Sequence, residues 1–125
     1  MTIRELPGLS AVIDEVGYAP DLEAPPEKPF RFIYSITIRN ESPETVTIRG
    51  RKWVVREATG EVTAVEGDGV VGKFPCLEPG ESFSYQSTHV VATEAEAEGA
   101  YFGTTAQGEA VFTRIPAFHL QPPPG

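Results

Sequence analysis

The sequence has few of the side chains that form disulfides and bind transition metals. Cys76 is its only cysteine, so no intrachain disulfide can form, whereas a secreted domain of this size often carries one or more pairs. Its two histidines, His89 and His119, are widely separated, and no C-x-x-C or H-x-x-x-H spacing occurs. We therefore expect a cytoplasmic protein that binds no metal and needs no cofactor.

Long apolar runs and an excess of basic charge are also lacking. No apolar run approaches the roughly 20 residues that cross a bilayer, and we expect no secretion signal. Ten basic and eighteen acidic side chains give a net charge of -8, which repels phosphate backbones and anionic lipid surfaces. These features argue against nucleic-acid binding and against a membrane location.

The composition that remains is typical of one globular domain. The 125 residues include 40% hydrophobic and 22% charged side chains, and we treat residues 1–125 as a single domain. Four prolines between residues 19 and 29 fix φ and withhold backbone donors, which predicts a surface loop there. Three prolines near the end predict a frayed tail over residues 121–125.

Apolar residues alternate with polar ones along most of the chain, as in short antiparallel strands. The clearest case is a single apolar face formed by Phe30, Phe32, Tyr34, Ile36 and Ile38. We expect strands near residues 9–16, 30–39, 45–48, 51–57, 62–65, 83–86, 101–105 and 109–115, with an exposed acidic loop over residues 93–99. The fold class predicted is an all-β sandwich of about seven to eight antiparallel strands.

The sequence pattern also predicts which individual side chains are buried and which are exposed. Trp53 shares its parity with Val55, which predicts a core position. Both histidines are expected at the surface. Cys76 is expected to be a buried, unreactive thiol because neither of its neighbours, Pro75 and Leu77, is basic. No catalytic triad can be assembled, so we predict that the protein is not an enzyme.

A glycine-rich stretch provides the first candidate binding site. Gly67, Asp68, Gly69 and Gly72 lie in a G-x-G-x-x-G pattern, the spacing that lets a backbone approach a pyrophosphate. Pro75 and Pro79 leave no room for the helix that this fingerprint requires, and Asp68 opposes an anionic ligand. The structural interpretation is that these glycines adopt positive φ in turns or bulges.

A basic segment provides the second candidate. Residues 28–56 hold seven of the ten basic side chains against two glutamates, so this segment carries +5 within an acidic chain. Solvent-facing positions on two strands with apolar inward neighbours are the simpler explanation of this bias. The functional hypothesis is a patch for an acidic protein partner, formed by Arg49, Arg51, Lys52 and Arg56.

Five motifs follow one another along nearly the whole chain. Residues 32–40 read F-x-Y-x-I-x-I-x-N, and residues 51–53 read R-x-W. Residues 65–80 read V-x-G-x-G-V-V-G-x-x-P-x-L-x-P-G, residues 83–87 read F-x-Y-x-S, and residues 115–118 read I-P-x-F. In this order the motifs resemble those of the bacterial ApaG (CorD) family. The chain departs from the family pattern at Lys52, Glu57, Thr88, Tyr101 and Thr105, which weakens any site inferred around the last three.

The resemblance implies an immunoglobulin-like or fibronectin type III-like sandwich. It also implies a family without established enzymatic activity, associated with cobalt and magnesium tolerance in bacteria and with interaction modules in eukaryotic F-box proteins. We therefore expect a non-catalytic interaction domain that contacts a protein near Arg51 and the glycine-rich loop. The alternative is a small-ligand protein that holds a phosphate-bearing metabolite or a metal complex at Gly67–Gly72. Neither a monomer nor a homodimer is excluded.

Overall fold

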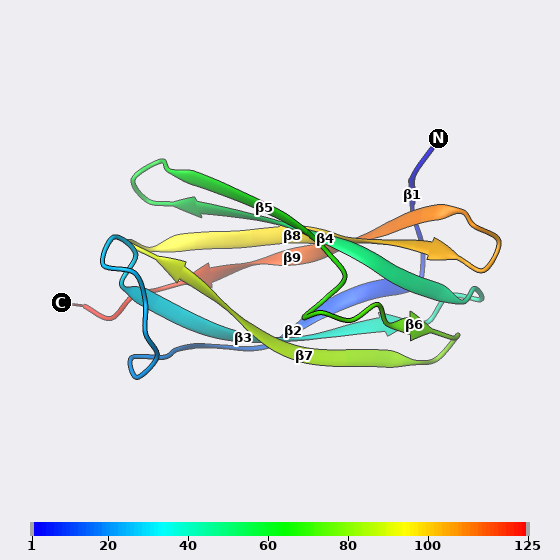
Figure 1. The fold of residues 1–125 in the computed structure, drawn as a ribbon, viewed down its shortest axis with the longest axis horizontal. Helices are drawn as coiled ribbons and strands as arrows, with labels where there is room; N and C mark the ends of the chain where they lie inside the picture. Colours follow the sequence, from blue (N-terminus) through cyan, green and yellow to red (C-terminus); the bar gives the residue numbers. More distant parts are fainter. Residues whose placement is uncertain (1, 125) are drawn as a thin grey trace.

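The computed structural model describes residues 2–124, which form nine β-strands in two facing sheets (Figure 1). The strands are β1 (Arg4–Glu5), β2 (Leu9–Tyr18), β3 (Phe30–Asn40), β4 (Val46–Glu57), β5 (Val62–Asp68), β6 (Cys76–Leu77), β7 (Ser82–Val91), β8 (Ala95–Thr105) and β9 (Ala110–Leu120). Within the described residues, no helix is long and apolar enough to cross a membrane.

The strand order divides the chain into a large and a small sheet. The large sheet runs β1-β9-β8-β4-β5, with β6 paired to the start of β4, and the small sheet runs β2-β3-β7. Every pair is antiparallel except β1 with β9, which is parallel. The all-β sandwich predicted from the alternation is confirmed. The described residues form nine strands instead of the expected seven to eight. The additional strands β1 and β6 have only two residues each, which is too short to show an alternation in the sequence.

The core lies between the sheets and is built by the alternation seen in the sequence. On β3, Tyr34, Ile36 and Ile38 are buried, as are Val46 and Ile48 on β4. Each large apolar side chain removed from water in this way contributes about 1.5–3 kcal/mol. Trp53 retains 3% of its surface exposed, which confirms its predicted core position.

Most strands are longer than the sequence indicated. β2 continues through Gly17 to Tyr18. The separate strands expected at residues 45–48 and 51–57 are one strand, β4, because a bulge between Ile48 and Gly50 absorbs the change of parity. The returning strand β5 pairs only with β4 and so lies at the sheet edge.

The prediction of an acidic loop over residues 93–99 is wrong. Residues 95–105 form β8, which lies between β9 and β4 near the centre of the large sheet. Ala95 and Ala97 are buried against the core, while Glu96 and Glu98 alternate with them on the outer face. Alanine side chains are small enough to fit a crowded inner face. They lack the large apolar groups by which a strand is recognised in a sequence, so this strand was missed.

Two proline-rich segments lack regular secondary structure. Residues 19–29 contain no strand or helix, as the prolines predicted. Residues 121–124 also have no regular secondary structure, while Gly125, the last residue of the predicted frayed tail, lies outside the described residues.

Candidate functional site

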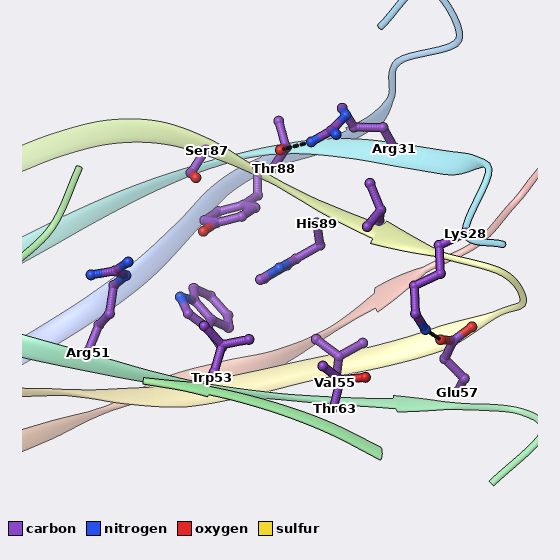
Figure 2. Close-up of a pocket in the computed structure, with 13 residues that line it drawn as sticks. Lys28, Arg31, Arg51, Trp53, Val55, Glu57, Thr63, Ser87, Thr88 and His89 are labelled. Carbon is purple, nitrogen blue, oxygen red and sulfur yellow. Dashed lines mark hydrogen bonds and ion pairs between the residues drawn. The ribbon is translucent and has the colours of Figure 1, made fainter. Parts of the chain in front are cut away.

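The sandwich is closed along one side and open along the other. β2 packs against β9 on the closed side. On the other side, β5 and β7 are the free edges of the two sheets. A cavity of about 290 Å³ lies there, lined by β3 and β7 from one sheet and by β4 and β5 from the other (Figure 2).

Three rings form the inner wall of this cavity. The Tyr34 and Trp53 ring centroids lie 5.1 Å apart. His89 stacks on Tyr34 at 4.7 Å and meets Trp53 edge-on at 4.6 Å. Such geometries add to the energy of apolar burial and hold each ring in one orientation. The inner wall is therefore preformed.

The structure overturns the prediction that His89 is a surface residue. Its Nε2 atom is buried and has no hydrogen-bond partner within residues 2–124. Burial disfavours the charged imidazolium and lowers the pKa of His89 to about 4. The ring is therefore neutral at pH 7, with a polar atom close to the cavity that the rest of the described chain leaves unpaired.

Arg51 lies at one end of the cavity because it shares the inward parity of Trp53. Its Nη1 atom donates to the backbone carbonyls of Asp68 at 2.9 Å and Gly69 at 3.2 Å. The guanidinium rests over Gly67, where a Cβ atom would approach it to between 2.6 and 2.8 Å. Gly67 is thus needed to seat the Arg51 side chain.

Lys28 and Glu57 lie at the other end of the cavity. Burial alone raises the pKa of Glu57, but hydrogen bonds from Lys28 and from the N–H groups of Ala92 and Thr93 hold the pKa of this carboxyl below its usual value. Lys28 also pairs with Glu61. These contacts fix β4 to the turn between β7 and β8, so Glu57 is a structural residue.

The four cationic residues predicted as one patch do not share one surface. Arg51 faces the cavity, whereas Arg49, Lys52 and Arg56 belong to the outer face of the large sheet. There Lys52 lies 3.9 Å from Glu66, and Arg56 pairs with Glu98. Arg49 donates to the hydroxyl of Thr104 at 3.1 Å. Any role of these four in binding stays a prediction.

The predicted glycine loop is a strand end followed by a tight turn. Gly67 and Asp68 close β5, and backbone bonds of 2.8 and 2.9 Å join Val70 to Lys73. Gly69 and Gly72 have φ of +63° and +77°, and a Cβ atom on Gly69 would collide with the carbonyl of Lys73. Turn geometry therefore accounts for these glycines, and β6 follows where a dinucleotide fingerprint needs a helix.

The remaining candidate ligands are dispersed. Cys76 is exposed, which corrects the expectation of a buried thiol. His119 faces solvent as expected, 3.8 Å from Glu96. Among residues 2–124, no group of three or more His, Cys, Asp or Glu side chains could hold a metal ion.

Comparison with known proteins places this fold and sequence in a family. The ApaG domain matches residues 20–105. Protein ApaG from Rhodospirillum centenum is 44% identical over 109 residues, covering 86% of this chain and 84% of the relative. Protein ApaG from Parvibaculum lavamentivorans is 42% identical over 113 residues, covering 90% and 87%.

Solved structures agree with the sequence relatives. The crystal structure of an ApaA protein from Bordetella pertussis superposes with a TM-score of 0.81 at 25% identity, covering 96% of this chain and 99% of that one. The structural genomics target SoR45 gives a TM-score of 0.82 at 27% identity, covering 93% and 88%. The chain therefore belongs to the ApaG domain family, as its motifs indicated.

Proposed function

We propose that this chain is a non-catalytic interaction domain that binds an extended segment of a protein partner along β5. The observation that carries the proposal is the position of β5, which pairs with β4 on one side only. An edge strand offers a row of unpaired N–H and C=O groups, and an added strand from another protein can satisfy them. We also infer a cytoplasmic location from the single cysteine.

Exposed apolar side chains on both faces of β5 and in the turn that follows support binding at the same edge. Val62 and Val65 on β5 are 57% and 47% exposed, and Val71 and Phe74 in the following turn are 48% and 52% exposed. Four of the seven exposed large hydrophobic residues of the described chain therefore fall within thirteen consecutive positions. Single exposed apolar residues are ordinary, but a concentration of them is typical of an interaction site.

The charges near β5 indicate the chemistry of the partner segment. Arg49, beside the β4 residue that pairs with Asp68, lies on the same outer face as Val62 and forms no ion pair with a carboxylate of the described chain. An acidic residue in the partner would complement it at that end. We therefore propose an extended segment that is apolar near Val62 and acidic near Arg49.

Selection from a random peptide library tests this proposal. We expect the purified protein to enrich extended, β-branched peptides that carry an acidic residue at one end. Val62→Glu and Phe74→Glu should each weaken the selected peptides about tenfold, because each places a charge in an apolar contact.

The matched control is Leu22→Glu, since Leu22 is 45% exposed but lies in the proline-rich loop. Its affinity should match the parent protein. If Leu22→Glu weakened binding as much as Val62→Glu, or if the enriched peptides bound all variants equally, β5 would not be the contact surface.

We do not propose phosphate binding by the Gly67–Gly72 loop. Its glycines are explained by backbone geometry, and the Asp68 carboxylate lies within it. A negative charge at that position disfavours a phosphate group.

A further inference from the structure

We propose that the cavity between β7 and the β4–β5 hairpin binds a small organic anion, with its apolar body against Trp53 and its anionic group on Arg51. The proposal is independent of peptide binding at β5. It rests on the shape of the cavity, on the guanidinium at its end and on the unpaired ring nitrogen of His89.

The size and composition of the cavity suit a compact ligand. Its volume of about 290 Å³ is near the lower end of the range for small-molecule sites. Trp53, Val55 and Val65 supply apolar surface, and polar groups stand at the ends. Figure 2 shows Arg51 at one end and the Lys28–Glu57 pair at the other, with Trp53 and His89 between them. This arrangement is typical of sites that bury an apolar body and orient it by a few polar contacts.

The charge in the cavity is opposite to that of the whole chain. Among its lining residues, Lys28 is neutralised by Glu57 and Glu61. Arg31 also contributes to the lining, but Figure 2 shows its side chain on the opposite side of β3 and β7 from Trp53 and His89, where it donates to Thr88 at 2.6 Å. Arg51 forms no ion pair with a carboxylate of residues 2–124, so its guanidinium remains unneutralised in a chain of net charge -8. A ligand that carries a carboxylate or phosphate would complement it.

The hydrogen bonds of Arg51 leave room for such a ligand. Both of its bonds to carbonyls use Nη1, whereas Nη2 and Nε make no hydrogen bond within the described chain. The two carbonyls and Gly67 hold the guanidinium in place before any ligand arrives. A donor fixed in this way loses little side-chain entropy on binding.

His89 supplies a second polar contact. A buried polar atom without a partner is costly, and native proteins rarely retain one without a functional or structural reason. A hydroxyl or carbonyl on the ligand body could pair with Nε2, since the neutral ring offers one donor and one acceptor.

Trp53 makes the test direct, because it is the only tryptophan and lines the cavity. We would titrate the protein with cyclohexanecarboxylate and cyclohexyl phosphate while following its fluorescence. The neutral cyclohexylmethanol and inorganic phosphate serve as matched probes that lack the charge or the apolar body. The first two should give saturable shifts, and each of the matched probes should bind about tenfold more weakly.

Variants assign the binding to the cavity. Arg51→Gln should weaken the organic anions about tenfold, whereas Arg39→Gln, at an exposed position of β3 outside the cavity, should leave their affinity unchanged. Because Arg51 also holds two backbone carbonyls, Thr63→Phe gives an independent check by filling the cavity from β5 without adding a second tryptophan. It should abolish binding at an unchanged melting temperature.

Three results would overturn the proposal. The first is the absence of saturation by either organic anion up to about 1 mM. The second is binding of inorganic phosphate or of the neutral alcohol as tight as that of the organic anions. The third is unchanged binding in Thr63→Phe.

Discussion

The burial of His89 predicts a specific loss of stability in mild acid. Its pKa is lowered from 6.5 to about 4 in the folded protein, so the unfolded chain binds the proton more readily. The contribution of His89 to the free energy of unfolding is therefore complete above pH 6.5 and is lost as the pH falls towards 4. One pKa unit corresponds to about 1.4 kcal/mol, so the loss reaches about 2 kcal/mol at pH 5 and about 3 kcal/mol at pH 4.

The surroundings of His89 explain why its pKa is lowered and not raised. The rings packed on it are Tyr34, Trp53 and Phe118, none of which can stabilise a positive charge as a carboxylate would. Of the charged groups lining the same cavity, Lys28, Arg31 and Arg51 oppose protonation, and the single carboxylate is Glu57, which pairs with Lys28. Because the pKa of Glu57 is also lowered, its own contribution is lost below about pH 4.5. The window between pH 5 and 7 therefore isolates His89.

Urea unfolding at pH 7 and pH 5, followed by Trp53 fluorescence, measures this effect. His89→Gln removes the titrating ring, and His119→Gln is the matched control because His119 is exposed. The parent protein and His119→Gln should each lose about 2 kcal/mol more between the two pH values than His89→Gln does. An equal loss in all three proteins would refute the assignment of His89 as a buried neutral base.

Three further substitutions test the packing, the turn and the outer face. Trp53→Ala should cost about 3–5 kcal/mol in urea unfolding, and a loss below about 1 kcal/mol would contradict its core position. Gly69→Ala should lower the stability by about 1–3 kcal/mol, because its φ is +63° and its Cβ would meet the Lys73 carbonyl; an unchanged melting temperature would contradict the turn geometry. Arg56→Gln should change the stability by less than about 1 kcal/mol, because its pair with Glu98 is exposed, and a larger loss would show that this outer-face ion pair is structurally important.

The sequence predicted the sandwich because its strongest signals are local. The alternation from Phe32 to Ile38 fixed both a strand and its buried face, and the shared parity of Trp53 and Val55 placed the tryptophan in the core. These positions are large and apolar, so their burial dominates the energetics of the strand. The family resemblance added the expectation of an immunoglobulin-like or fibronectin type III-like sandwich.

The candidate site was harder to predict, although the sequence already showed that two of its residues share the parity of core residues. His89 has the same parity as Phe83 and Tyr85, so extending that strand by three residues would have turned its ring inward. Arg51 likewise shares the parity of Trp53. The cavity itself depends on which strands are the free edges of two opposed sheets. That property is set by long-range pairing, and local alternation does not encode it.

The most direct test of the proposed interaction is hydrogen–deuterium exchange on the protein with and without a selected peptide. Strand addition predicts that amides of Val62–Asp68 become protected in the complex, with smaller changes in β7 and in the proline-rich loop. Protection that is absent from β5 and concentrated elsewhere would contradict binding along this edge.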